Sequence, residues 1–320
     1  MDFEILISNL TNPTLLFFVL GIFAVIVKSD LEIPEGSVKF ISLYLLFAIG
    51  FKGGTGLAQS QFSWTIIYSL LFGIVIASLI PLYTFFILKR RMSVSDAGAV
   101  AATYGSVSAV TFVAATTFLE SQKINFGGEM VAVMALMESP AIIIGVILMM
   151  IYDKDSENQA SLKEVVQHSF TNGSVLMILG SLLIGFIADT KQAEGIKPFT
   201  TDIFKGFLAI FLLDIGMVTA RRFATFKKYG WFVTLFALLI PLINGSLVAL
   251  ISKIVTAEVG NRFIFAILAA SASYIAVPAA MRLAAPKSDP GLYIPMALGV
   301  TFPFNITIGM PIYFAIVKAT

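Results

Sequence analysis

Long apolar stretches separated by short polar ones run through almost the whole chain. A helix needs about 20 mostly apolar residues to cross the hydrocarbon core of a bilayer. Stretches of this order, which we number as predicted spans one to ten, lie at about residues 13–28, 37–57, 63–88, 95–118, 129–152, 172–189, 200–220, 229–252, 261–284 and 291–317. The pattern predicts an all-α polytopic membrane protein of about ten transmembrane helices.

One substantial polar stretch, Asp153 to Thr171, interrupts this pattern. It divides the chain into residues 1–152 with spans one to five, a linker over 153–171, and residues 172–320 with spans six to ten. We expect the linker to lie at the surface, with room for one short helix.

The two halves of the chain resemble each other. Four matches occur in the same order in both: Asn12-Pro-Thr-Leu-Leu with Asn172-Gly-Ser-Val-Leu, Ala48-Ile-Gly-Phe with Asp214-Ile-Gly-Met, Pro81 with Pro241, and Met134-Ala-Leu before Pro140 with Met296-Ala-Leu before Pro303. Because each half has an odd number of predicted spans, related halves must cross the membrane in opposite directions. The sequence therefore predicts two inverted five-helix repeats, an architecture that recurs in secondary transporters.

Composition agrees with a membrane protein and narrows its chemistry. Hydrophobic residues make up 58% of the 320 residues and charged residues only 12%, whereas soluble domains carry roughly a quarter charged residues. The net charge of +2 is too small to indicate a nucleic-acid partner. With no Cys and a single histidine, His168, the chain has no thiolate or histidine metal site and no Ser-His-Asp triad. We expect neither an enzyme nor a bound cofactor.

Basic residues predict the orientation of the bundle in the membrane. The densest clusters, Lys89-Arg90-Arg91 and Arg221-Arg222 with Lys227-Lys228, fall on the same side of the membrane if the spans alternate in direction. Cytoplasmic loops carry the excess of Lys and Arg. This favours a multi-pass protein of the inner (plasma) membrane with both termini outside and the linker in the cytoplasm. Asp2 and Glu4 replace the basic residues that begin a signal peptide, so we expect the first apolar stretch to be retained.

Spans four and nine contain the strongest candidates for a binding site. Each combines small hydroxyl residues with a helix breaker near its middle, Gly105 or Pro278. A broken helix exposes backbone N–H groups and positive dipole potential at the start of its second half, which suits an anion. The alternative is that the small residues only let helices pack closely. The predicted anion-binding residues are Gly105, Ser106, Ser108, Thr111, Ser271, Ser273 and Tyr274.

Span five adds an acidic residue, Glu138, close to the predicted anion site. A carboxylate inside a membrane costs a few kcal/mol, about 2.5–3.5 on insertion scales, and marks a functional site by default. Pro140 frees a backbone carbonyl beside it, and hard cations prefer oxygen ligands. We predict that Glu138, with Thr301 and Asn305 from span ten, ligates a coupling Na⁺. Proton carriage by Glu138 and a structural ion pair are the alternatives.

Lys52 and the residues after it raise two further expectations. Asp214 in span seven has Ala48 as its counterpart in the first half, so it is not part of the symmetric core. A structural ion pair with Lys52 and a functional role are both open for this acid. The glycine-rich run after Lys52, residues 53–56, is not expected to be a phosphate loop, because no strand precedes it and the Gly-Lys-Ser/Thr ending is absent.

Several of these segments together resemble the sodium-dependent bicarbonate transporter family known from cyanobacteria. The similar segments are Asn12-Pro13-Thr14-Leu15, Ile33-Pro34-Glu35, Ile49-Gly50 with Gly53-Gly54, Gly105-Ser-Val-Ser108 through Leu119-Glu120-Ser-Gln122-Lys123-Ile124, Met137-Glu138-Ser-Pro140-Ala141, and Ala269-Ala-Ser271-Ala-Ser273 through Pro278 and Arg282. The resemblance implies a core domain that slides against a gate domain, a homotrimer, and Na⁺ and bicarbonate bound near the crossing of spans four and nine.

The chain departs from the family pattern inside the predicted site. Ala109-Val110 replaces Gly-Ser after the first serine pair, and Tyr274-Ile-Ala276-Val277-Pro278 replaces Asp-Ile-Ser-Gly-Pro after the second. An acid and two hydroxyls are therefore missing. The polar stretch between the repeats is also shorter, which weighs against the small nucleotide-binding regulatory partner of cyanobacterial members.

The sequence thus predicts a secondary transporter in membrane lipid, with sodium-coupled uptake of bicarbonate or a similar small anion. Spans one, two, six and seven would form the gate past which the core moves. Two alternatives stay open: a proton-coupled carrier of a small organic acid, with Glu138 as the proton carrier, and a membrane sensor or scaffold that no longer transports.

Overall fold

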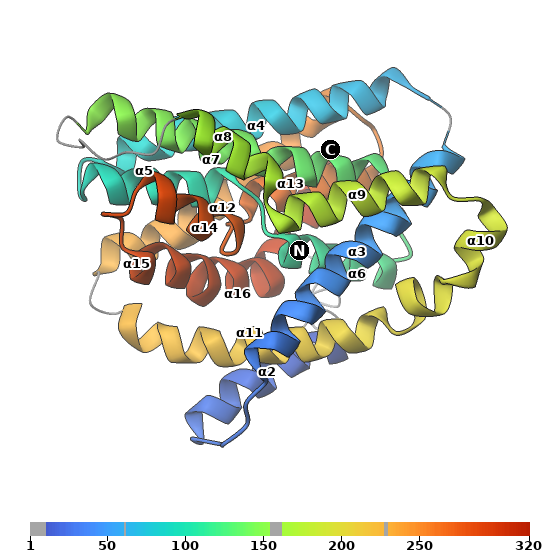
Figure 1. Ribbon diagram of the computed structural model, residues 1–320, viewed down its shortest axis with the longest axis horizontal. Coiled ribbons are helices and arrows are strands. Elements are labelled where there is room, and N and C mark those ends of the chain that lie inside the picture. The colour runs from blue at the N-terminus through green and yellow to red at the C-terminus, as the bar shows by residue number, and fades with distance from the viewer. Residues whose placement is uncertain (1–10, 61, 154–161, 227–229) are drawn as a thin grey trace.

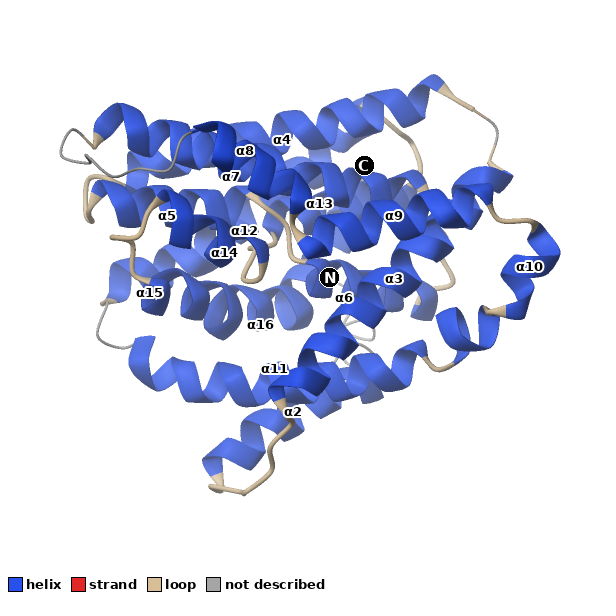
Figure 2. Ribbon diagram, viewed as in Figure 1, coloured by secondary structure: helices blue, strands red, loops and turns tan. Residues whose placement is uncertain are grey.

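The computed structural model describes residues 11–60, 62–153, 162–226 and 230–320. Within these ranges every regular element is a helix and there is no strand, which confirms the all-helical prediction (Figure 2). Asp2 and Glu4, the linker residues 154–161, and Lys227 and Lys228 lie outside the described residues.

The helices follow one another along the chain with short connections (Figure 1). In chain order they are α2 (Pro13–Ile26), α3 (Glu35–Gln59), α4 (Trp64–Leu88), α5 (Val94–Gly105), α6 (Ala109–Ser121), α7 (Glu129–Tyr152), α8 (Leu162–Thr171), α9 (Gly173–Ile187), α10 (Thr190–Gly195), the π-helix η1 (Pro198–Asp202), α11 (Phe204–Phe226), α12 (Trp231–Ile251), the 3-10 helix η3 (Ser252–Ile254), α13 (Val259–Ala270), α14 (Ala276–Ala284), α15 (Pro290–Pro295), the π-helix η4 (Met296–Thr301), α16 (Phe302–Phe304), the π-helix η5 (Asn305–Gly309) and α17 (Met310–Ala319).

Seven helical stretches of the described chain are long and apolar enough to cross a membrane. They are Glu35–Gln59, Trp64–Leu88, Val94–Ser121, Glu129–Tyr152, Pro198–Arg221, Trp231–Ile254 and Pro290–Ala319. Three shorter apolar helices, α2, α9 and α13, fall on predicted spans one, six and nine. The protein is a multi-pass membrane protein, as predicted, whereas the layout of ten spans in two inverted repeats stays a prediction.

The long helices pack in two groups. In the first, α2 lies along α11 and α3 lies along α9, and α3 also contacts α11; we call α2, α3, α9 and α11 the gate group. In the second, α4, α5 and α7 pack together, as do α12, α13 and α17, and α13 contacts α6; we call α4–α7 and α12–α17 the core group. In Figure 1 α2 and α11 lie at the lower edge of the molecule, away from α4 and α7.

Small residues let the gate helices approach each other closely in both of their pairs. A Cβ atom at Gly21 of α2 would collide with the α11 backbone, and one at Gly216 of α11 would collide with the α2 backbone. In the other pair, a Cβ at Gly50 of α3 would collide with Ser181 of α9. Gly50 and Gly216 are equivalent in the matched halves of the sequence, so the same close contact recurs in both pairs.

The described part of the linker is a helix, α8, which packs on α7, α9 and α14. Its one buried apolar side chain, Val165, is 1% exposed, while Leu162, Lys163 and Glu164 are exposed. This short helix therefore lies on the surface of the core group and ends directly before α9 begins.

The structural pair between Lys52 and Asp214, one of the two alternatives for Asp214, is wrong. Lys52 Nζ instead lies 3.0 Å from Glu120 Oε1, at the end of α6. Lys205 of α11 lies 3.1 Å from the same Glu120 carboxylate. Asp214 follows Lys205 by two and a half turns of α11, about 13 Å along the helix, so it lies too far along α11 to reach Lys52. The glycine run after Lys52 lies inside α3 and forms no loop.

Candidate functional site

Both segments with small hydroxyl residues are broken helices. Helix α5 ends at Gly105, three residues cross in extended form, and α6 begins at Ala109. Ser108 caps α6, because its side chain accepts a hydrogen bond of 3.2 Å from the Thr111 N–H. The second segment is irregular from Ser271 to Ile275, between α13 and α14.

Pro278 lies within the second half-helix and not at the break itself. It occupies the third position of α14, Ala276–Ala284. The first turn of a helix tolerates proline, because the N–H groups there have no intrahelical partner. The break consequently falls earlier than the proline suggested, at the serines.

The two breaks are hydrogen-bonded to each other. The Ser108 N–H donates to Ser271 Oγ over 3.1 Å, and Ser271 Oγ donates in turn to the Leu268 carbonyl over 2.8 Å. In the opposite direction, the Ser273 N–H donates to the Thr103 carbonyl over 2.9 Å. The core group therefore contains a crossing of two interrupted helices whose exposed backbone ends face each other.

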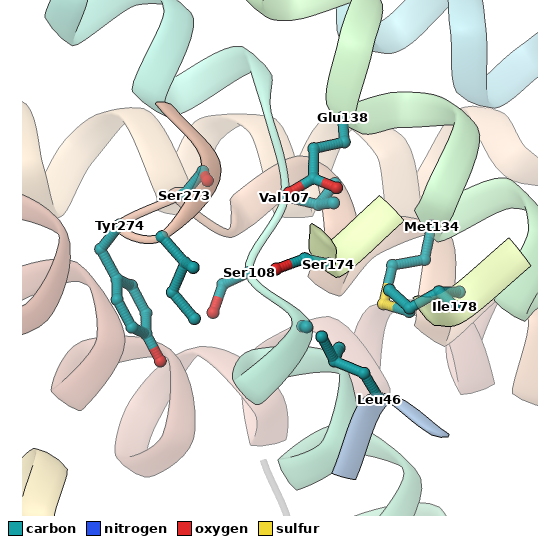
Figure 3. Close-up of a pocket in the computed structure, with 11 residues that line it drawn as sticks. Leu46, Val107, Ser108, Met134, Glu138, Ser174, Ile178, Ser273 and Tyr274 are labelled. Carbon is teal, nitrogen blue, oxygen red and sulfur yellow. The ribbon is translucent and has the colours of Figure 1, made fainter. Parts of the chain in front are cut away.

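A small cavity lies at this crossing, between the core and gate groups (Figure 3). Its volume is about 20 Å³, which is room for one or two water molecules. The lining residues come from both breaks, from α7 of the core and from α3 and α9 of the gate: Leu46, Val107, Ser108, Ala109, Met134, Glu138, Ser174, Ile178, Ser273, Tyr274 and Ile275.

Three of the predicted anion-binding residues, Ser108, Ser273 and Tyr274, line this cavity. The Ser108 hydroxyl accepts from the backbone of its own helix, so its hydrogen stays available to a ligand. The Tyr274 hydroxyl is buried and lies near Ser108 without the geometry of a hydrogen bond. The cavity thus offers hydroxyl donors beside the start of α6.

The other predicted anion-binding residues lie beside the first break and do not line the cavity. Ser271 is bonded to both helices, and Thr111 supplies the capped N–H of α6. A Cβ at Gly105 would collide with the Pro81 ring and lie 3.0 Å from the Ala141 Cβ. Ser106 is completely buried, and its hydroxyl has no hydrogen-bond partner in the described part of the protein.

Glu138 faces the cavity from α7. Its residue exposure is 7%, and among the described residues its carboxylate has neither a hydrogen bond nor an ion pair. Figure 3 shows the carboxylate beside Val107, in the first break. A buried acid without a partner is costly in its charged form, so it requires a bound cation or a proton.

Thr301 and Asn305, the other two predicted cation ligands, lie away from this cavity. Thr301 Oγ1 donates to the Ala237 carbonyl over 2.8 Å and is 2.8 Å from the Tyr104 hydroxyl. Asn305 Nδ2 donates to the Ala270 carbonyl over 2.7 Å, at the end of α13. Of the three residues, Glu138 alone lines the cavity, and their joint role as cation ligands stays a prediction.

No cluster of three or more acidic, His or Cys residues converges anywhere in the described chain. A cation beside Glu138 would therefore be held by one carboxylate and by neutral oxygens. Hydroxyl and backbone carbonyl oxygens suit a hard cation such as Na⁺ better than a transition metal. The donor set is compatible with the predicted coupling ion.

The gate wall of the cavity was not predicted from the sequence. Leu46, Ile178 and Ser174 come from helices far from the breaks along the chain. The position of Ser174 could have been predicted from its neighbour Asn172, which is typical of a helix start. The Asn172 side chain caps α9 by accepting from the Ser174 N–H over 2.9 Å. The same Asn cap begins α2, where Asn12 accepts from Thr14 over 2.9 Å.

Comparison with known proteins adds one finding to this geometry. No curated protein matches the chain. A family model described as the Na⁺-dependent bicarbonate transporter superfamily matches residues 13–318, which include both broken helices and Glu138. The chain therefore belongs to the Na⁺-dependent bicarbonate transporter superfamily.

Proposed function

We propose that this protein is a secondary transporter that takes up bicarbonate, or a similar small monovalent anion, together with Na⁺. The observation that carries the proposal is a cavity at the crossing of two broken helices, with an unpartnered carboxylate in its wall. Both breaks and Glu138 belong to the core group, so a movement of the core past the gate would carry them away from the gate wall on α3 and α9. Family membership supports the same substrates.

The anion would bind at the start of α6. The helix has 13 residues, and the N–H groups of its first turn, apart from that of Thr111, have no side-chain cap. These groups and the helix dipole favour a negative charge without a basic side chain. The hydroxyls of Ser108 and Tyr274, and Ser273 across the cavity, would donate to the anion oxygens.

Glu138 would couple the anion to a cation. Two negative charges about 5 Å apart repel each other by roughly 3 kcal/mol at an effective dielectric constant of 20. An ionised Glu138 would therefore oppose an anion in so small a cavity unless a cation neutralises it. Bound Na⁺ removes this repulsion, and anion and cation then bind cooperatively.

Protonation of Glu138 would remove the same repulsion, and this makes a proton-coupled carrier of a small organic acid the second candidate. The lack of a partner for Glu138 supports either ion. The absence of an acid at position 274 reduces the negative charge available to hold Na⁺. Proton coupling is therefore better supported for this chain than family membership alone would suggest.

The assembly and orientation are part of the proposal. The resemblance to cyanobacterial transporters supports a homotrimer in the plasma membrane. The basic clusters at the ends of α4 and α11 support termini on the outside and α8 in the cytoplasm.

Uptake of labelled bicarbonate into proteoliposomes tests the function, with a sodium gradient or a pH gradient imposed in turn. We expect uptake to follow the sodium gradient, and Glu138→Gln to reduce sodium-driven uptake by about tenfold or more, because a neutral amide leaves no charge for the cation. Glu35→Gln is the matched control, since Glu35 is an exposed acid at the start of α3.

The other outcomes separate the rival functions. Uptake that follows only the pH gradient, and is also lost in Glu138→Gln, would establish the proton-coupled carrier. No uptake under either gradient would leave a sensor or scaffold that retains the fold.

A further inference from the structure

Glu120 ties the core group to the gate group through two ion pairs. It is the penultimate residue of α6 in the core. Its Oε1 lies 3.0 Å from Nζ of Lys52 on α3, and its Oε2 lies 3.1 Å from Nζ of Lys205 on α11. Both lysines belong to the gate group, so one core carboxylate bridges two gate helices.

A narrow crevice between the groups lies next to these ion pairs. It has a volume of about 10 Å³ and is lined by Asn12, Thr14, Leu15, Ala114, Thr117, Phe118, Leu208, Leu212 and Met310. Phe118 is within one helical turn of Glu120, and Leu208 is within one turn of Lys205. The ion pairs therefore join the groups directly beside a nearly closed space between α6 and α11.

The glycine run after Lys52 brings the groups into close contact at the same place. A Cβ at Gly53 would collide with the side chain of Val131 in α7, and one at Gly56 would lie 3.9 Å from the Gly128 Cα. These two glycines are three residues apart and share one face of α3. This face of α3 touches the core, whereas a Cβ at Gly54 would collide with the α9 backbone within the gate.

We propose that Glu120, Lys52 and Lys205 form an ionic latch that holds the core against the gate in this conformation and must open in each transport cycle. The proposal rests on the core movement in the proposed function. A shift of one helical turn, about 5.4 Å, would separate charges that now lie within hydrogen-bond distance.

The exposure of the latch suits a contact that opens repeatedly. The side chains of Glu120, Lys52 and Lys205 are 41%, 55% and 59% exposed. Partly exposed ion pairs contribute little net stability, because water competes for both charges. The latch would therefore bias the equilibrium between conformations without fixing it.

Reversible cross-linking tests whether the latch opens. The chain contains no Cys, so Lys52→Cys with Glu120→Cys gives the only two thiols, and a short bifunctional methanethiosulfonate can join them. We expect cross-linking to reduce bicarbonate uptake by about tenfold or more, with recovery after reduction, because the core can no longer move.

A matched pair inside the core is the control. The Asp289 N–H donates to Asp96 Oδ1 over 2.8 Å, and both residues lie in the core group. Cross-linked Asp96→Cys with Asp289→Cys should retain uptake, because the core moves as a body. Unchanged uptake after cross-linking of positions 52 and 120 would overturn the latch.

A second measurement does not depend on transport. Ser174→Cys reports on the cavity, and a membrane-impermeant thiol reagent measures its accessibility. Glu120→Gln should change the labelling rate by roughly two- to tenfold, because loss of both ion pairs shifts the equilibrium away from this conformation.

This second result separates the latch from the proposed function. A changed labelling rate in a protein without uptake would keep the latch and refute the transporter. An unchanged labelling rate in a protein that takes up bicarbonate would refute the latch and keep the transporter.

Discussion

The two breaks differ in length, burial and capping, although they occupy equivalent places in the two halves of the sequence. The first consists of Ser106, Val107 and Ser108, which are 0%, 5% and 4% exposed. It ends in a serine cap. The second extends from Ser271 to Ile275, and the Ile275 residue is 39% exposed. Helix α14 begins after this break without a side-chain cap.

The first turns of the two half-helices make similar contacts. Asp96 in the first turn of α5 accepts from the N–H of Asp289 over 2.8 Å, and Asn261 in the first turn of α13 accepts from the N–H of Gly127 over 2.7 Å. Each contact holds the residues before the next membrane-crossing helix. The first turns of α5 and α13 therefore make equivalent contacts, although Ser93 caps α5 and α13 has no side-chain cap.

This difference assigns the two breaks different tasks. The first break is short, buried and capped, so it can present the N–H groups of α6 at a fixed position. The second break is longer and partly exposed, and it carries Tyr274, where the family pattern has an acid. Ala276, where the pattern has a hydroxyl, is the first residue of α14. Changes that disturb the backbone of the first break, at Gly105 or through its hydrogen bond to Ser271, should therefore weaken the site, whereas a change at Tyr274 should alter which ions it binds.

The largest effect is expected from Gly105→Leu at the end of α5. The added side chain must displace Pro81 and Ala141, and overpacking of this kind costs about 1–3 kcal/mol or more. We expect uptake to be abolished. Gly180→Leu is the control, because a Cβ at Gly180 meets nothing within 4 Å. Normal uptake by Gly105→Leu would refute the rigid first break.

A smaller loss is expected from Ser271→Ala, with Ser106→Ala as the control. Removal of the Ser271 hydroxyl leaves the Ser108 N–H buried without a partner, at about 1–3 kcal/mol. The Ser106 hydroxyl has no partner to lose, so its removal should change thermal stability by less than about 0.5 kcal/mol. Thermal unfolding in detergent measures both, and equal losses would show that the breaks are not joined through Ser271.

At the second break, Tyr274→Asp is expected to change the affinity for sodium and not to abolish uptake. The added carboxylate would give a cation a second charged ligand beside Glu138, because both positions line the cavity. We expect the sodium concentration for half-maximal uptake to fall by roughly tenfold, about 1.4 kcal/mol. Tyr274→Asn, which adds no charge, is the control. A response to the pH gradient alone in all variants would contradict sodium coupling.

Local signals predicted much of this architecture from the sequence. The apolar runs placed the membrane helices, and Gly105 with its serines marked the first break. Pro278 misplaced the second break by a few residues, because proline fits the first turn of α14 and does not end α13. Such signals act within one or two turns of the chain, so short-range patterns suffice to find them.

Contacts between distant segments could not be predicted in this way. Leu46 and Ile178 are ordinary apolar residues in their own helices, and only the packing of α3 and α9 against the break brings them to the cavity. The partner of Lys52 lies 68 residues away, on a helix whose end the sequence does not place beside α3. The charged residues can be read from the sequence, but which helices pack against each other, and so which charges pair, cannot.

The small volume of the cavity has a consequence for selectivity. A space of about 20 Å³ leaves no room for a hydration shell, so the proposed anion would have to shed nearly all its water to bind. The free energy of ion hydration rises with the square of the charge, about four times higher for a divalent anion than for a monovalent one of equal size. In the proposed transporter, the cost of dehydration would therefore exclude carbonate and sulfate and favour bicarbonate, which carries a single charge.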